Sequence, residues 1–426
     1  MDLLVKNIGV LATAKGKSAL KGSHMAEVES ALNYAIGVKD GMIAYVGPES
    51  EAPEAKEVVD ALGRLVTPGL VDAHTHLVFG GWRQHEMELK LKGAGYLDIL
   101  KAGGGILSTV RATRAASFDE LCSKAGKLSY YMMAQGTTTI EAKSGYGLNV
   151  EDEIKQLEVV QKLNGDKTVA ADFVSTFMGA HAVPEEYKGR PEEYIDFVCE
   201  TIMPEVVNKN LAEYCDIFCE TGVFDAGLSE KLLLRARELG LKLKIHADEI
   251  EPVGGGELAG RIKCHSAEHL IAATDEGIDL MAQNGVIGVL LPATSFYLDK
   301  PFARARYMID KGMAIAIASD FNPGSSPSYS LQFAMNLACL RYKLTPEEAL
   351  AAVTINAAAA IGRAETVGTI EVGKKADFVV WDAPDLNYIF YRYGNNQAET
   401  VYKNGKIVAG SAVWVTFYGD TKGFCN

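Results

Sequence analysis

Residues 241–249, LKLKIHADE, alternate apolar and polar side chains over the length of one strand. Successive side chains of a strand point to opposite faces, so the leucines and the isoleucine share one face and Lys244 and His246 share the other. If helices cover the apolar face, the polar face points into the fold, where a lysine without a counter-charge is costly. We therefore expect a polar interior in which Lys244 pairs with a carboxylate, either Glu141 or Glu220.

Seven more segments in the middle of the chain have the length and apolar character of strands. With the first, the candidates are 66–74, 137–141, 171–180, 214–220, 242–248, 266–270, 286–291 and 313–319. Helical patterns separate several of them. One ends at Gly240, and another opens at Thr345 with a capping box and a proline at the first helical position. Eight strands separated by helices over about 250 residues match an α/β fold, the (β/α)8 TIM barrel.

Both ends of the chain differ from this middle, because they contain short alternating runs and tight turns. The dipeptides at 40–41 (Asp-Gly) and 404–405 (Asn-Gly) are typical of β-hairpins. We therefore expect a small β-sandwich domain assembled from residues 1–65 and 366–426. The barrel domain is expected over residues 66–365.

The overall composition is that of a globular protein with a net acidic charge. The chain has 426 residues, 48% hydrophobic and 23% charged, and a formal net charge of -13. That charge, with no run of Lys and Arg, argues against nucleic acid and anionic membranes as partners. Seven cysteines without a CxxC pair indicate a reduced, cytoplasmic protein. We see neither a signal peptide nor an apolar stretch of about 18 residues.

The segment VDAHTHLVFGGWR, residues 71–83, ends a predicted strand with two histidines two positions apart. Side chains at i and i+2 point the same way, so His74 and His76 project together at the rim of the barrel. Taken alone, this pair fits hydrogen-bonded histidines in a turn equally well. Further candidates follow the carboxyl ends of other predicted strands: His181, His246, His269 and Asp320. Neutral imidazoles with one carboxylate form a site for Zn²⁺ or Fe²⁺, so we expect a metal centre at this rim.

Six stretches carry the most specific motifs of the chain. They are VFGGWRQHEMELKLKGAGYLDILKAGGGILSTVRATR (78–114), TTTIEAKSGYGL (137–148), FMGAHAVP (177–184), IHADEIEPVGGGELA (245–259), SAEHL (266–270) and SDFNPGSSP (319–327). Together they closely resemble the imidazolonepropionase family of the amidohydrolase superfamily. The resemblance runs from about residue 60 to residue 362 and continues more loosely into both ends. It implies a distorted barrel beside a small β-sandwich, and a homodimer.

The resemblance also implies roles for particular residues. The metal ligands it implies are His74, His76, His246 and Asp320. A single ion fits best, because the fourth strand, YCDIFCE, has no lysine for carbamylation, the usual bridge in two-metal members. The catalytic residues it implies are Glu249, His269 and Asp320, and which is the principal base stays open. The substrate-binding residues it implies are Arg83, Tyr146, His181, Glu249, Asn322, Gly324 and Ser325.

The reaction implied opens the ring of 4-imidazolone-5-propanoate, a small anion, with water and gives N-formimidoyl-L-glutamate in histidine degradation. A divalent metal, zinc or iron, would lower the pKa of water from about 15.7 to about 7. The planar guanidinium group of Arg83 could bind the propionate carboxylate through two hydrogen bonds. Its alternative role is an ion pair with Glu86 or Glu88. His181 has the alternative of a core histidine. Trp82 departs from the small residue expected beside the glycine pair and would narrow the pocket.

Two other functions stay open from the sequence. One is a different cyclic amidohydrolase or deaminase of the same superfamily, against which Arg83 argues, because neutral bases need no carboxylate clamp. The other is a non-catalytic assembly protein, against which the complete ligand set argues. The glycine runs at 103–105 and 254–256 lack the Gly-Lys-Ser/Thr of a phosphate-binding loop. We expect the remaining histidines to be structural or exposed: His24, His85 and His265.

Overall fold

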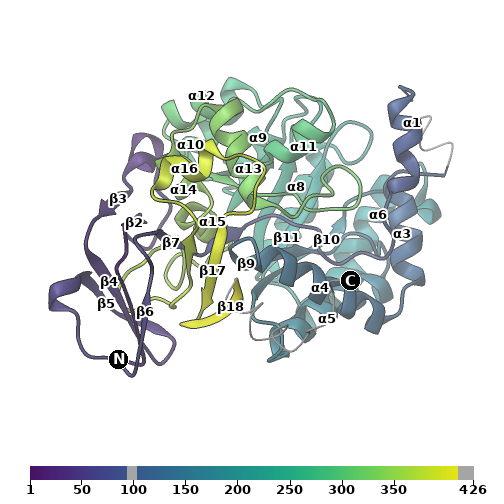
Figure 1. Ribbon diagram of the computed structural model, residues 1–426. Coiled ribbons are helices and arrows are strands. Elements are labelled where there is room, and N and C mark those ends of the chain that lie inside the picture. Colours follow the sequence, from purple (N-terminus) through teal and green to yellow (C-terminus); the bar gives the residue numbers. More distant parts are fainter. Residues whose placement is uncertain (94–102, 411–426) are drawn as a thin grey trace.

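The computed structural model describes residues 1–93 and 103–410, and at its centre eight parallel strands form a nearly closed barrel (Figure 1). The strands are β8 (Leu70–Asp72), β9 (Thr137–Lys143), β10 (Asp172–Ala180), β11 (Tyr214–Cys219), β12 (Lys242–Ala247), β13 (Ser266–His269), β14 (Ile287–Leu290) and β15 (Ile315–Ile317). Each pairs in parallel with the next. An isolated parallel bridge from Thr75 to Phe321 joins the last strand to the first. The predicted barrel is confirmed.

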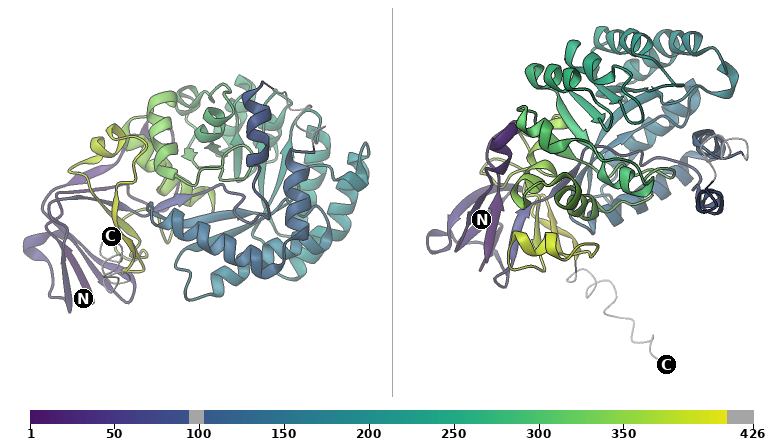
Figure 2. Two further views of the ribbon diagram at one scale, coloured as in Figure 1. Left: turned by 45° about the vertical axis from the view of Figure 1, so that its right-hand side comes forward. Right: turned by 90° about the horizontal axis from the view of Figure 1, so that it is seen from above.

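Helices alternate with these strands, and most of them cover the outside of the barrel (Figure 2). They are α1 (Met87–Leu91), α3 (Ile106–Ala115), α4 (Phe118–Met133), α5 (Val150–Gly165), α6 (Pro191–Phe197), α7 (Met203–Asn208), α8 (Ala226–Glu238), α9 (Gly255–Arg261), α10 (Asp275–Asn284), α11 (Pro292–Tyr297), α12 (Ala305–Asp310), α13 (Leu331–Leu337), α14 (Pro346–Ala352) and α15 (Ile355–Ala360). The capping box predicted at Thr345 is present. The helical pattern after it is divided into α14 and α15, however, because the backbone at Thr354 leaves the helical region.

Two further sheets, built from both ends of the chain, lie beside the barrel (Figures 1 and 2). One has the order β5-β4-β1-β6 and the other β18-β17-β16-β7-β2-β3. Their strands are β1 (Leu3–Lys6), β2 (Val10–Thr13), β3 (Glu29–Ala31), β4 (Tyr34–Lys39), β5 (Met42–Pro48), β6 (Glu57–Asp60), β7 (Leu65–Pro68), β16 (Phe378–Trp381), β17 (Ala398–Lys403) and β18 (Lys406–Gly410), with α16 (Leu386–Tyr391) between β16 and β17. Apolar side chains of both sheets form one cluster, so the two ends make the predicted sandwich.

The turns of this sandwich are those that the sequence predicts. Residues 40–41 join β4 to β5 and residues 404–405 join β17 to β18, with positive φ at both positions of each turn. We propose residues 1–65 and 366–410 as one domain and 66–365 as the other, with β7 (Leu65–Pro68) extending the sandwich sheet across that boundary to residue 68. The segment 411–426, which the prediction also assigns to the small domain, lies outside the described residues.

The segment predicted as one strand at 66–74 is two strands in different sheets. β7 pairs with β2 and β16 of the sandwich, whereas β8 pairs with β9 of the barrel. The chain changes sheet at Gly69, where a Cβ atom would lie 2.4 Å from Thr138 Oγ1, so glycine permits a close approach that other residues would not. His74 and His76 consequently lie beyond the end of β8.

The interior of the barrel is polar, as the alternation in β12 predicts. Lys244 has 0% exposure, and its Nζ lies 3.0 Å from Glu268 Oε1 and 3.6 Å from Glu141 Oε1. The prediction of a partner at Glu141 is confirmed, although the closer partner is Glu268. The alternative, Glu220, is wrong, because its carboxylate accepts hydrogen bonds from the backbone of Thr221 and of the loop after β12.

Two further features concern the length of the apolar helices and the state of the cysteines. Within residues 1–93 and 103–410, no helix combines the length and the apolar character that a bilayer-spanning helix needs. The cysteines in the described part of the chain all carry free thiols: Cys122, Cys199, Cys215, Cys219, Cys264 and Cys339. The seventh, Cys425, lies outside it.

Candidate metal centre and active site

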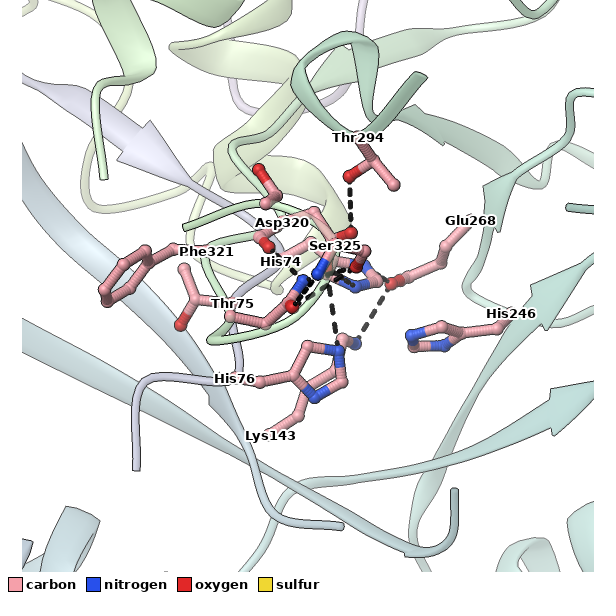
Figure 3. A network of polar contacts seen from close by, with 12 residues as sticks. His74, Thr75, His76, Lys143, His246, Glu268, Thr294, Asp320, Phe321 and Ser325 are labelled. Atoms are coloured by element: carbon pink, nitrogen blue, oxygen red, sulfur yellow. Dashed lines mark hydrogen bonds and ion pairs between the residues drawn. The ribbon is translucent and has the colours of Figure 1, made fainter. Parts of the chain in front are cut away.

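Three imidazoles and one carboxylate converge at the carboxyl end of the barrel (Figure 3). His74 and His76 follow β8, His246 lies in β12, and Asp320 follows β15. One ring nitrogen of each histidine lies within 4.8 Å of the other two. Asp320 Oδ1 lies 3.4 Å from His74 Nε2 and 3.7 Å from His76 Nε2. Backbone contacts that close the barrel bring these loops together, because Asp320 N donates to His74 O.

Several ring nitrogens of this group have no hydrogen-bond partner in the described part of the chain. Among the described residues, His246 Nε2 and His76 Nδ1 have no hydrogen-bond partner, although both side chains are buried. An unpaired buried polar atom typically costs about 1–3 kcal/mol. Three neutral imidazoles and one carboxylate also match the donors that zinc and iron(II) take in catalytic sites. The residues therefore fit a divalent metal ion.

Two carboxylates behind the histidines orient the imidazoles. Glu268 Oε2 contacts His74 Nδ1, and Asp216 Oδ2 lies 3.1 Å from His246 Nδ1. A carboxylate that accepts the Nδ1 proton leaves the Nε2 lone pair directed at the cluster. Burial opposes protonation of His74, but the Glu268 and Asp320 carboxylates outweigh it and raise its pKa to about 9. Burial, together with His181 and the other cluster histidines, holds the pKa of His76 well below its usual range.

The acidic and basic side chains around the cluster have divergent proton affinities. Burial, reinforced by Asp320, raises the pKa of Glu249 to about 8, whereas burial lowers that of His269 well below its usual range. The two side chains face each other, with Glu249 Oε2 3.7 Å from His269 Nε2. Burial opposes ionisation of Asp320, but His74 and a 2.5 Å hydrogen bond from Thr294 lower its pKa to about 2.

The backbone at these strand ends is also unusual. His269 has φ 69° and Asp320 has φ 51°, in the left-handed region that residues other than glycine rarely adopt. Such conformations persist only where surrounding contacts hold them and occur often at functional sites. Here they turn both side chains toward the cluster.

Two aromatic side chains lie against the metal-ligand group. The His181 ring stacks on His76, with centroids 4.7 Å apart and planes 15° apart. Tyr146 lies 5.3 Å from His181 and 5.8 Å from His76. His181 Nδ1 lies 3.2 Å from Gly145 O, and burial lowers its pKa to about 3, so the ring is neutral. These positions place both candidate substrate-binding residues beside the cluster.

Arg83 is bonded on two of its nitrogens and open on the third. Its Nε and Nη2 donate to the buried Glu86 carboxylate at 2.8 and 3.0 Å, so the alternative ion pair with Glu86 exists. The other alternative, Glu88, pairs with Lys92 instead. Arg83 Nη1 faces Gly324, where a Cβ atom would come within 2.0 Å of it. No hydrogen bond of Nη1 is found in the described part of the chain.

The Asn322–Ser325 loop satisfies its own polar groups. Asn322 Oδ1 accepts from the amides of Gly324 and Ser325, each at 2.8 Å, and its Nδ2 donates to Asp320 O at 2.7 Å. The amides of Gly324 and Ser325, two of the expected substrate-binding residues, are thus engaged within the turn. Trp82, expected to narrow the pocket, packs its ring against Phe79 and Phe321.

The histidines expected to be structural or exposed, and one of the glycine runs, have roles outside the metal-ligand group. His24 and His85 are exposed. His265 immediately precedes β13, and its Nε2 forms a hydrogen bond with Ala359 O. The amides of the glycine run 254–256 face a carboxylate of the protein itself, because Gly255 and Gly256 donate to Asp248. Sequence reasoning missed Asp216 and Glu268, which lie within predicted strands, and Lys143, which lies two residues beyond the predicted strand 137–141 and inside β9. The signal that could have found them was the inward polar face that contains Lys244 and His246.

Comparisons with known proteins agree with this geometry. The amidohydrolase family model matches residues 65–408. The imidazolonepropionase of Bacillus cytotoxicus is 50% identical over 420 residues, 97% of this chain and 99% of the relative, and that of Bacillus thuringiensis is 50% identical over 422 residues, 98% and 99%.

Solved structures show the same fold at low identity. A zinc-bound adenosine deaminase from Xanthomonas campestris matches with TM-score 0.68 and 19% identity, covering 96% of this chain and 93% of that one. A 5-methylcytosine deaminase from Klebsiella pneumoniae matches with TM-score 0.70 and 15% identity, covering 94% and 97%. Family model and close relatives together show that the chain belongs to the amidohydrolase family and, within it, to the imidazolonepropionases.

Proposed function

We propose that this protein opens the ring of 4-imidazolone-5-propanoate with water and releases N-formimidoyl-L-glutamate. The observation that carries the proposal is the buried group of three histidines and an aspartate, in which the Nε2 atoms of His74 and His246 have no hydrogen-bond partner among the described residues. The identity of the substrate is inferred from the relatives named imidazolonepropionase, which are 50% identical over nearly the whole chain.

In this proposal one divalent ion, zinc or iron, is held by four side chains: His74, His76, His246 and Asp320. When bound, such an ion polarises the ring carbonyl and makes water a stronger nucleophile at neutral pH. Asp216 and Glu268 hold the imidazoles in the tautomer that leaves their Nε2 atoms free. The low pKa of Asp320 keeps its carboxylate ionised and able to act as a ligand.

The proton transfers fall to Glu249 and His269. Hydrolysis breaks the bond between the ring carbonyl carbon and nitrogen, so a proton must leave the attacking water and a proton must reach the departing nitrogen. Paired groups whose environments push their pKa values apart suit such exchange. Before a metal binds, Glu249, with its pKa near 8, holds a proton at neutral pH, and His269, whose pKa is held well below its usual range by burial, is neutral. Asp320 remains a third candidate base.

Substrate binding in this proposal divides between the tail and the ring. Arg83 binds the propionate carboxylate through Nη1, while Glu86 fixes the rest of its guanidinium. Tyr146 and His181 hold the ring beside the cluster with Glu249, and the loop of Asn322, Gly324 and Ser325 borders it. We further propose a homodimer in the cytoplasm, consistent with the free thiols, with neither nucleic acid nor membrane as a partner.

The test is to mix purified protein with 4-imidazolone-5-propanoate and follow the loss of ring absorbance, with and without a chelator. We expect turnover that the chelator abolishes and that added zinc or iron(II) restores. Guanine and cytosine serve as comparison substrates for the deaminase alternative. Turnover of either base without turnover of the imidazolone would replace the proposed reaction.

A further inference from the structure

A group of charged side chains lies one layer deeper in the barrel than the metal-ligand group, and the proposed function assigns a role only to its Asp216 and Glu268. This inner charge cluster consists of Glu141, Lys143, Asp216, Lys244 and Glu268, each with 0% exposure. Lys143 pairs with all three carboxylates, and Figure 3 shows its contact with Glu268. The Nζ atom lies 2.8 Å from Glu141 Oε1, 2.7 Å from Asp216 Oδ2 and 3.0 Å from Glu268 Oε2.

Two of these carboxylates also hold metal-ligand histidines. Glu268 Oε2, which faces Lys143, is the oxygen that contacts His74 Nδ1. Asp216 Oδ2, which also faces Lys143, lies 3.1 Å from His246 Nδ1. One ammonium group therefore fixes both carboxylates and, through them, two imidazoles that come from opposite sides of the barrel.

The same carboxylates form a second set of metal-ligand atoms. One atom each of Asp216, His246 and Glu268 lies within 4.8 Å of the others, as the nitrogens of His74, His76 and His246 do. His246 thus belongs to both sets. Lys143 Nζ stands within 3.0 Å of both carboxylates of the second set, so a positive charge already lies between them.

The charges of the inner cluster show what removal of Lys143 would leave. Three carboxylates face two ammonium groups, which leaves one net negative charge. Lys244 contacts Glu268 and Glu141, but in the described residues no ion pair joins it to Asp216. Without Lys143 the cluster would hold two uncompensated charges, and Asp216 would have no ammonium partner. Buried charge of that size is strongly unfavourable unless another cation enters.

We propose that the Lys143 ammonium takes the place of a second divalent cation. It thereby limits the centre to one ion and holds Asp216 and Glu268 in the orientation that positions His246 and His74. Lys143 is in this sense a positioning residue. The inference rests on the metal centre of the proposed function, but it concerns the number of ions and the role of a side chain outside the ligand set.

The experiment compares the zinc content of three chelator-treated proteins after reloading with excess zinc chloride and gel filtration. We expect one zinc per chain in the wild type and two in Lys143→Ala, because the smaller side chain opens the space between Asp216 and Glu268. The matched control is Lys244→Ala. It removes the same charge from the same cluster without opening that space, and we expect it to keep one zinc.

A neutral side chain of similar length gives a second variant that tests positioning. Lys143→Met fills the space without charge, so we expect one zinc per chain, released to a chelator about 10- to 100-fold faster than from the wild type, as for other residues that orient metal ligands. This measurement decides the inference if Lys143→Ala does not fold. Release from Lys143→Met at the wild-type rate would then overturn it.

The outcomes separate the inference from the function on which it rests. A wild type that retains no zinc contradicts the metal centre itself. One zinc in both the wild type and folded Lys143→Ala leaves the centre intact and overturns the role of Lys143, as do two zinc ions in the wild type. Spin coupling between two Mn²⁺ ions in Lys143→Ala, absent from the wild type, would support adjacent sites.

Discussion

The barrel contains two layers of polar side chains that are almost equally buried but differently satisfied. In the inner charge cluster, Lys143 and Glu268 have 0% exposure, and in the metal-ligand group above it, His246 and Asp320 have 2%. Each charged group of the inner cluster contacts an opposite charge. The histidines above it keep ring nitrogens without a hydrogen bond in the described part of the chain.

The comparison teaches that missing partners, rather than burial, distinguish a binding site from an internal support. Nearly all buried polar groups in proteins are hydrogen-bonded, so unpaired nitrogens at His76 and His246 indicate a ligand that the chain does not supply. In the inner cluster, by contrast, Lys143 forms an ion pair with each of the three carboxylates. Changes in the upper layer should therefore affect metal and chemistry, whereas changes in the lower layer should act through orientation.

The largest expected effect is that of His246→Ala. Removal of one of four ligands should abolish retention of metal after gel filtration and reduce kcat/KM by at least about 10⁴-fold, because water then lacks the activation that the ion gives. Elemental analysis and the absorbance assay measure both. His265→Ala is the matched control, since His265 lies before β13 with its Nε2 bonded to Ala359 O, and it should keep both. Stoichiometric metal in His246→Ala would remove this residue from the ligand set.

The second prediction concerns Glu249, which lies beside the metal-ligand group and is not a metal ligand in our proposal. Glu249→Gln should lower kcat by about 10²- to 10⁴-fold, the usual contribution of a general acid or base, and leave the metal content unchanged. Glu251→Gln, an exposed neighbour bonded to Thr221, should retain full activity. Loss of metal from Glu249→Gln would instead make Glu249 a ligand.

Much of the fold follows from sequence periodicity, because a barrel strand and its helix are each local patterns. The strand predicted at 214–220 corresponds to β11 (Tyr214–Cys219), and the strand predicted at 242–248 corresponds to β12 (Lys242–Ala247). The error at 66–74 has a physical cause. The apolar run is continuous there, and pairing partners far along the chain decide that Pro68 and Leu70 belong to different sheets.

The candidate site could also be predicted only in part. Strand-end placement was enough to bring His74, His246 and Asp320 together, since parallel strands end at one rim. The partners of the lower layer were not predictable to the same degree. The inward position of Lys244 was enough to predict a carboxylate partner. The choice between Glu141 and Glu220, and the closer contact with Glu268, depend on strand register and loop conformation, which only the coordinates give.

The third prediction uses the pH dependence of metal binding. In the metal-free protein the pKa of His74 is about 9, so His74 is protonated at pH 7, and a metal ion must displace that proton to bind. The affinity for zinc should therefore rise about tenfold per pH unit for each proton displaced, through the range below pH 9, and level off above it.

Glu249, with a pKa near 8, is a second source of protons, because a bound cation offsets the repulsion from Asp320 that helps to raise that pKa. Competition with a chelator of known proton affinity, from pH 6.5 to pH 8.5, measures the slope. In Glu249→Gln the slope that remains, about one, belongs to His74. An affinity independent of pH in that variant would show that His74 is neutral before the metal binds.

The smallest effect concerns Arg83, which combines the properties of both layers. Two of its nitrogens are fixed by Glu86, as in the inner cluster, and Nη1 is open, as in the metal-ligand group. A hydrogen bond to a charged group is worth about 1.5–3 kcal/mol, so Arg83→Ala should raise KM about 10- to 100-fold with little change in kcat or metal content. An analogue whose propionate is replaced by propionamide separates loss of tail binding from local disorder. Arg83→Ala leaves the Glu86 carboxylate without its arginine partner, and any disorder that results would affect both substrates alike. We expect the variant and the wild type to turn over this neutral analogue with similar kcat/KM, and an equal loss on both substrates would place the tail carboxylate elsewhere.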